Sequence, residues 1–206
     1  MYFTEDMQTF FGSTAGKARF GENPSGFFFW RKVVGQIVLN PGVLTIALYR
    51  LSRSLYVRDK VLASRIVDRL TEFTTGAQFT GQSEFGPGLQ VHHPAGLVVS
   101  PESNGGERVM LMGGVALGIR DVKADPFGQS PTLGDDVVVG SGAKILGPIH
   151  VGDRSQVAAN SVVMVDVPAD AIAVGIPAKV IVKDGSGSNS KDASAAGAKP
   201  ATKPGS

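Results

Sequence analysis

Apolar residues recur at every sixth position through the stretch from Leu133 to Val163. The first residue of each hexapeptide is apolar and mostly β-branched: Leu133, Val139, Ile145, Val151, Val157 and Val163. A period of six matches neither the 3.6-residue repeat of a helix nor the alternation of an ordinary strand. It is typical of a parallel β-helix, in which each hexapeptide makes a short strand and a corner. We therefore expect a mainly β fold in which these apolar residues stack inside the coils.

The same frame continues toward the N-terminus with one polar position. It falls on Phe79, Phe85, Val91, Leu97, Ser103, Val109 and Val115. The interval from Val115 to Leu133 is long enough for one more coil. Residues 119–132, however, carry charges and two prolines and would put Asp121 in the frame. We expect an extruded loop there, because long loops in compact domains are usually functional.

The segments on either side of the repeat differ from it in pattern. Residues 1–78 are expected to form a small helical region, although residues 1–26 show no pattern that predicts an element. Helical spacing of apolar residues predicts three helices, at Phe27–Leu39, Val43–Val57 and Lys60–Phe73. The β-helix domain is expected at residues 79–184. Residues 185–206 are rich in Gly, Ser, Ala, Pro and Lys, which predicts a disordered tail.

Composition and charge exclude several classes of function and of site. A net charge of +2 over 206 residues is too small to indicate nucleic-acid binding. The chain has no cysteine, which excludes disulfides, zinc–thiolate sites and a cysteine nucleophile. The N-terminus lacks the basic segment of a secretory signal, and no apolar segment reaches the ~20 residues that span a bilayer. We expect a cytoplasmic protein. The cluster Phe27–Trp30 is expected to pack on protein rather than on a membrane, since too few basic residues accompany it.

Three histidines carry the candidate chemistry, at positions 92, 93 and 150. A neutral imidazole can accept a proton from a hydroxyl at physiological pH. A zinc site of three histidines, as in a γ-class carbonic anhydrase, is the alternative. Adjacent strand residues point to opposite faces, so His92 and His93 would not both bind one ion, and His150 is more than fifty residues away. We therefore expect no metal.

Several segments resemble the serine acetyltransferase family. They are HHPAGLVV, GGVALG, the hexapeptide run, VPADAIAVGIPAKVI and the helical segment YRLSRSLYVRDKVLASRIVDRL. The resemblance spans roughly Phe27–Val182 and implies a left-handed parallel β-helix that assembles as a homotrimer. It also implies acetyl transfer from acetyl-CoA to a hydroxyl of serine or a related small acceptor, with a sugar as an alternative. The active site would lie between adjacent subunits.

The resemblance also assigns roles to residues. His93 matches the family's general base, and backbone N–H groups near Gly113 and Gly114 would stabilise the oxyanion. The acyl donor would lie along the coils, with Lys179 meeting a CoA phosphate as a point charge. The positions implied for donor binding are Gly114, Gly118, Ser141, Gly142, Ala159 and Lys179.

The sequence departs from the family at the acceptor side. His92 and Gln78 stand where the family has acids, and Gln129 and Ser130 stand where it has an Arg-His pair. These four are the candidate substrate-binding residues. The helical region is short, so we expect a trimer only, and the chain ends in Ser206, so we expect no complex with cysteine synthase. Two alternatives stay open: a non-catalytic CoA-binding scaffold, and a metal-dependent hydratase.

Overall fold

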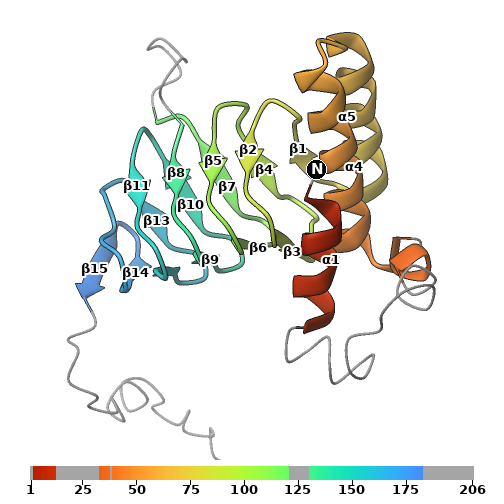
Figure 1. The fold of residues 1–206 in the computed structure, drawn as a ribbon. Helices are drawn as coiled ribbons and strands as arrows, with labels where there is room; N and C mark the ends of the chain where they lie inside the picture. Colours follow the sequence, from red (N-terminus) through yellow and green to blue (C-terminus); the bar gives the residue numbers. More distant parts are fainter. Residues whose placement is uncertain (1, 13–32, 38, 121–129, 183–206) are drawn as a thin grey trace, which may run out of the picture.

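Three parallel sheets wind around one axis in the computed structural model, which describes residues 2–12, 33–37, 39–120 and 130–182. Helices lie at one end of the coils, and β14 and β15 lie at the other (Figure 1). The fold is a left-handed parallel β-helix with N-terminal helices, as the sequence predicted. The domain boundaries stay predictions, and the tail lies outside the described residues.

Each coil contributes one short strand to each sheet. The first sheet contains β1 (Gln78–Phe79), β4 (Val98–Val99), β7 (Ala116–Gly118), β10 (Lys144–Leu146) and β13 (Val162–Val163). The second contains β2 (Glu84–Phe85), β5 (Asn104–Gly105), β8 (Thr132–Leu133) and β11 (His150–Val151). The third contains β3 (Gln90–His92), β6 (Met110–Met112), β9 (Val138–Val139), β12 (Gln156–Val157), β14 (Ala171–Gly175) and β15 (Ala178–Val182). Because β7 and β8 are successive strands of one coil, the residues between them add no further coil. Residues 121–129 of the predicted loop lie outside the described part.

The single six-residue frame is wrong between Leu97 and Val115. Val99, not Leu97, is the register partner of Phe79, and Leu111 is the partner of Val91. The frame shifts by two residues because the corner between β3 and β4 holds two residues more than a hexapeptide corner. The four predicted positions are nevertheless buried, and each lies two residues before the stacked residue of the strand that follows it: Leu97, Ser103, Val109 and Val115.

Inside the second coil, the ring of Phe85 occupies the space that a side chain at Gly105 would take. Gly105 is the register partner of Phe85, and a Cβ at Gly105 would overlap the Phe85 ring. The ring of Phe85 also lies edge-on to that of Phe79, with 5.3 Å between ring centroids. The first coil therefore has an aromatic core, and the later coils have an aliphatic one.

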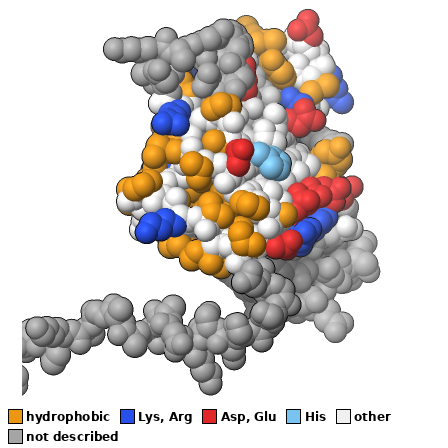
Figure 2. Space-filling view, turned by 90° about the vertical axis from the view of Figure 1, so that its left-hand side faces the viewer, with side chains coloured by type: hydrophobic (Ala, Val, Ile, Leu, Met, Phe, Trp, Pro, Cys, Tyr) orange, Lys and Arg blue, Asp and Glu red, His pale blue; other side chains and the backbone are white. Residues whose placement is uncertain are grey.

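The C-terminal end of the coils carries exposed hydrophobic side chains. Figure 2 looks onto this end and shows many hydrophobic side chains on it. The large ones exposed here are Val165, Val174, Ile176, Ile181 and Val182. The hairpin of β14 and β15 forms part of this end, and its two strands run antiparallel.

Two long helices pack at the N-terminal end of the coils, as predicted. They are α4 (Pro41–Val57) and α5 (Val61–Thr75). Asn40 caps α4, because its side-chain Oδ1 accepts a hydrogen bond from the Gly42 N–H at 3.0 Å. Gly76 ends α5 with a φ of 71°, a conformation that glycine adopts without strain. Residues 33–37 of the predicted Phe27–Leu39 helix are helical, and residues 27–32 lie outside the described part.

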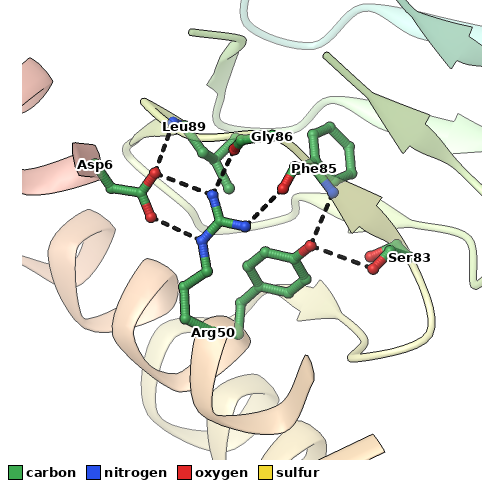
Figure 3. A network of polar contacts seen from close by, with 7 residues as sticks. Asp6, Arg50, Ser83, Phe85, Gly86 and Leu89 are labelled. Carbon is green, nitrogen blue, oxygen red and sulfur yellow. Dashed lines mark hydrogen bonds and ion pairs between the residues drawn. The ribbon is translucent and has the colours of Figure 1, made fainter. Parts of the chain in front are cut away.

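A third helix, α1 (Phe3–Gly12), falls where the sequence predicted no element. It is held by a buried ion pair (Figure 3) between Asp6 and Arg50, whose side chains are 0% and 4% exposed. Arg50 donates to Asp6 through Nε at 2.7 Å and through Nη2 at 3.0 Å. It also donates to the backbone carbonyls of Phe85 and Gly86, both at 2.6 Å. The pair therefore joins α1, α4 and the first coil.

The Asp6 carboxylate has a third donor, the backbone N–H of Leu89 at 2.9 Å. Burial raises the pKa of the Asp6 carboxyl, and the Arg50 guanidinium beside it opposes that rise. Because a buried carboxylate is stable only when its hydrogen-bonding capacity is used, these contacts fix the position of α1.

Among the described helices, none combines the length and hydropathy that a bilayer crossing requires.

Candidate active site

His93 lies at the corner between β3 and β4. Its φ of 53° is in the left-handed region, which is uncommon for a residue with a side chain. The next residue, Pro94, is buried and anchors the corner, whereas the His93 side chain is exposed. Within the described part of the chain, no hydrogen bond engages the His93 ring. The backbone therefore fixes the direction in which the His93 side chain leaves the chain, and the ring nitrogens stay accessible.

His92 lies in different surroundings from its neighbour. It is half-buried, and its ring stacks on Phe10 of α1 with 6.4 Å between ring centroids. Its Nε2 is 3.4 Å from Oε1 of Gln90. Burial lowers the pKa of His92, and the nearby His93 imidazole lowers it further. His92 thus packs toward α1, and its predicted role in substrate binding stays a prediction.

Residues in the left-handed conformation form a column along the His93 corner. Gly96, Gly114 and Gly142 have φ values of 73°, 70° and 75°, and Asn160 continues the column with 57°. A Cβ at Gly114 would lie 3.4 Å from the Gly142 Cα. Glycine adopts this positive φ without strain, whereas most residues with a side chain do not. The same corner exposes Ser141 and Ala159. The structure therefore brings four of the predicted donor-binding positions together: Gly114, Ser141, Gly142 and Ala159.

The backbone groups of this column already take part in hydrogen bonds. Gly114 N–H donates to the Ala95 carbonyl at 3.0 Å, and Gly142 N–H donates to the Gly113 carbonyl at 2.9 Å. The Gly114 N–H thus has a partner between coils, and the oxyanion role expected for the N–H groups near Gly113 and Gly114 stays a prediction. The Lys144 ammonium also donates to the Gly114 carbonyl.

Two predicted donor-binding residues lie away from this corner. Gly118 is at the opposite end of its strand, where its carbonyl accepts a hydrogen bond from Gly147 N–H at 2.9 Å. Lys179 is exposed on β15, opposite Val174. The structure does not bring either of them to His93.

The predicted acceptor-binding residues are also spread over the chain. Gln78 is exposed on β1, and its Nε2 donates to Oε1 of Glu72 at 2.8 Å. The Oγ atoms of Ser130 and Ser100 are 2.8 Å apart at the corner between the first and second sheets. His93 lies at the corner between the third and first sheets, so one chain does not place Ser130 beside it. Gln129 lies outside the described residues.

A groove runs along the Ser130 corner, and the sequence analysis did not predict it. It consists of two hollows of about 680 and 630 Å3 that share Glu102, Asn104 and Ser130. We call it the loop-side groove. It also contains Thr132 and His150, which form a register column with Asn104. The sequence frame places Thr132 and His150 just before stacked residues, but it places Asn104 after Ser103, so the column of three follows only from the observed register.

The histidines do not gather into a metal site. Among the described residues, no three side chains of His, Cys, Asp or Glu are grouped so that they could hold a metal ion. His150 lies in the loop-side groove, where its backbone N–H donates to Asp166 Oδ1 at 2.8 Å. The geometry thus gives no support to a three-histidine site.

Comparison with known proteins agrees with this architecture. Residues 130–164 match the family described as bacterial transferase hexapeptide (six repeats). The chain is 38% identical over 148 residues to the serine acetyltransferase of Helicobacter pylori strain J99, an alignment that covers 72% of this chain and 85% of that protein.

Solved structures similar to this chain include serine acetyltransferases. The serine acetyltransferase of Brucella abortus strain S19 superposes with a TM-score of 0.73 at 26% identity, covering 88% of this chain and 68% of that one. A second structure of a serine acetyltransferase from that strain, in complex with coenzyme A, gives a TM-score of 0.72 at 27% identity, covering 88% and 66%. The coverage and identity with the Helicobacter protein show the relationship directly: this chain belongs to the serine acetyltransferase family and is an acyltransferase built on a left-handed β-helix.

Proposed function

We propose that this protein transfers an acetyl group from acetyl-CoA to a hydroxyl of serine or a related small acceptor. His93 is the general base of this reaction. The observation that carries the proposal is the exposed imidazole, held by a left-handed backbone at the corner that also displays the glycine column. Two relatives that bear the name serine acetyltransferase, from Helicobacter and Brucella, support the acceptor.

The chemistry at His93 is a proton transfer coupled to acyl transfer. The neutral imidazole accepts the proton of the acceptor hydroxyl, and the hydroxyl oxygen attacks the thioester carbonyl carbon. The bond from that carbon to sulfur then breaks, and the leaving thiolate takes up the proton. The products are an acetyl ester and free CoA, so one thiol is released in each turnover.

The acyl donor is proposed to lie along the His93 corner. Gly114 and Gly142 lie on this corner, and the exposed Ser141 offers a hydroxyl beside them. The Brucella relative in complex with coenzyme A supports a CoA donor. Lys179 and Gly118 are the remaining donor contacts that we propose.

The active site is proposed to be shared between subunits of a homotrimer. Within one chain, Ser130 and His93 lie at different corners of the coil. A neighbouring β-helix packed side by side would bring its Ser130 corner toward this chain's His93 corner. Gln78, His92 and Gln129 are the other proposed substrate contacts, and no complex with cysteine synthase is proposed.

A thiol-release assay with acetyl-CoA and L-serine, extended to other small hydroxyl compounds, tests the proposal. His93→Ala is expected to lower kcat/KM by about 10²–10⁴-fold, the usual contribution of general acid–base catalysis. Gln156→Ala, at an exposed position of β12, is the matched control and should retain activity. Full activity of His93→Ala, or no thiol release with any acceptor, would contradict the proposal.

One observation favours a second candidate, a trimer that binds CoA without turnover. In the described residues, no carboxylate accepts a hydrogen bond from His93 to orient its ring. Calorimetric titration with acetyl-CoA separates the two candidates, because the scaffold would bind the thioester tightly and release no thiol.

A further inference from the structure

Helix α5 turns its small polar side chains toward the interior and its large apolar ones toward the surface. Ser64, Thr71 and Thr75 are buried against the rest of the chain. The other side of the helix carries four large apolar residues that are between 48% and 89% exposed: Leu62, Ile66, Leu70 and Phe73. We call these four residues the α5 stripe. A surface helix that packs only on its own core has the reverse arrangement, so the stripe requires a partner.

The orientation of α5 is fixed by hydrogen bonds on its polar face. The Oγ of Ser52, on α4, lies 2.8 Å from the Oγ of Ser64 and donates to Oδ1 of Asp68. The same carboxylate oxygen accepts a hydrogen bond from the Gly81 N–H at 3.2 Å. Rotation of the helix to bury the stripe would break these bonds and leave buried polar groups without partners. The single chain therefore keeps the stripe at its surface.

Helix α5 lies beside the first sheet at the N-terminal end of the coils (Figure 1) and leads through Gly76 into β1. The helix and this sheet line one hollow of about 450 Å3, to which β4 contributes Val98 and Val99. The first sheet lies between the His93 corner and the Ser130 corner, the two corners that the proposed function shares between subunits. Neighbours that reach both corners enclose the first sheet between them, and α5 with it.

The charges beside the stripe favour a copy of this chain over a lipid surface. The side of α5 that faces the hollow carries two cations and two anions: Arg65, Arg69, Asp68 and Glu72. These four charges cancel, so they give no attraction to anionic headgroups. A surface that carries both signs can instead pair with an identical surface. Arg69 already donates to Glu72 within the helix at 2.9 Å.

We infer that the α5 stripes of three subunits pack against one another at the N-terminal end of the proposed homotrimer. Rotational symmetry brings identical helices together around one axis, and each stripe is then buried by its two copies. The inference rests on the proposed function, because neighbours at both corners of the first sheet bring the stripes together. It makes α5 the element that holds the shared site closed. Glu72 links the helix to that site, since its Oε1 accepts a hydrogen bond from Gln78 at 2.8 Å.

Ile66→Glu tests the stripe in the full chain, because it would place three like charges around the axis. Sedimentation velocity over a range of protein concentrations is expected to show a trimer for the wild type. For the variant, half-assembly should need at least tenfold more protein. Val57→Glu is the matched control, since Val57 is 68% exposed, against 62% for Ile66, and borders a different hollow beside Glu84. It should assemble like the wild type, and circular dichroism checks that both variants fold.

A charge-reversed partner shows whether the stripes meet each other. Ile66→Lys is expected to weaken assembly in the same way as Ile66→Glu. An equimolar mixture of the two variants, unfolded and refolded together, should recover trimers at concentrations where each variant alone is monomeric. Opposite charges attract only if residue 66 of one subunit lies near residue 66 of the next. A stripe that binds any other surface would give no recovery.

The outcomes separate this inference from the proposed function. A monomeric wild type, equal masses of Ile66→Glu and Val57→Glu, or no recovery in the mixture would overturn the inference. So would a wild-type hexamer that Ile66→Glu divides into trimers, or wild-type binding to anionic vesicles that Ile66→Glu abolishes. The masses are measured without acetyl-CoA. A trimer that depends on the stripe and releases no thiol therefore supports the inference and contradicts the transfer, whereas a catalytic trimer insensitive to Ile66→Glu does the reverse.

Discussion

The backbone carbonyl of His93 lies against Gly113 of the next coil, in the space that a Cβ at Gly113 would take. Gly113→Ala should therefore push the His93 corner away from its neighbour. Because a displacement of about 1 Å in a catalytic group can lower the rate ~10²-fold, we expect a loss of activity of that order. Thiol release measures it.

Gly35→Ala is the control for this substitution, because no atom of the described residues lies within 4 Å of a Cβ at that position. It should keep full activity. If Gly113→Ala were as active as Gly35→Ala, with the same melting temperature, the packing of this corner would not position His93.

The half-buried His92 makes the stability of the protein depend on pH. The folded protein lowers the pKa of His92 below its ordinary value of 6.5, so the unfolded chain binds more protons below that value. The free energy of unfolding should then fall as the pH falls through this region, and the contribution should be complete above it. Melting temperatures between about pH 7.5 and 5.5, on either side of the ordinary pKa, measure the effect.

His92→Gln should flatten this dependence, because it removes the group whose protonation changes. His150→Gln is the comparison, since His150 is exposed on β11 and carries no such burial. An unchanged slope in His92→Gln would show that other groups determine the acid sensitivity.

Breaking the Asp6–Arg50 pair should destabilise the protein strongly. Asp6→Asn leaves the buried guanidinium without its counter-charge, which typically costs ~3–5 kcal/mol. The double substitution Asp6→Leu with Arg50→Met removes both charges and should recover part of the loss. Urea unfolding at a fixed protein concentration measures the differences in free energy.

Arg53→Met is the matched control on the same helix. Arg53 pairs with Glu84 at 2.6 Å, but the Glu84 side chain is 70% exposed. Exposed pairs contribute about 0–1 kcal/mol, so the control should change the stability little. Equal effects of Arg53→Met and Asp6→Asn would mean that burial does not strengthen the Asp6–Arg50 pair.

The exposed charged side chains at the corner between the second and third sheets should contribute much less to stability than the Asp6–Arg50 pair. Arg108 donates to both carboxylate oxygens of Asp136, at 2.7 and 2.8 Å, and lowers the pKa of that carboxyl. This contribution to stability is present above the ordinary pKa of Asp136 and is lost as the pH falls. Because both side chains are more than 40% exposed, Arg108→Lys should cost less than about 1 kcal/mol. Unfolding in high salt should reduce the difference further.

The sequence revealed the repeat but not its full register. From Leu133 onward, the predicted stacking positions are the observed ones. At the His93 corner, two additional residues shift the frame, and hydrophobicity alone could not show this. Leu97 and Val99 are both apolar and both buried, so either frame satisfies the pattern. Only strand pairing distinguishes them.

The sequence predicted the His93 corner of the candidate site better than the groove at the Ser130 corner. His93 and the glycine column belong to contiguous motifs, so the sequence shows them directly. The loop-side groove is formed by residues from successive coils, such as Asn104 and His150, whose proximity requires the correct frame. The Asp6–Arg50 pair joins residues 44 positions apart, and each reads as a surface charge in isolation.

The antiparallel hairpin at the C-terminal end determines how long the structure can grow. The third sheet runs from β3 to β15, and β15 occupies the position that the next parallel strand would take. An uncovered parallel edge would template a coil from another molecule, and repetition of that contact would build a fibre. The reversed strand, with the charged Lys179 exposed on it, gives an incoming coil the wrong polarity. The hairpin thus acts as a terminator that keeps a repetitive fold finite.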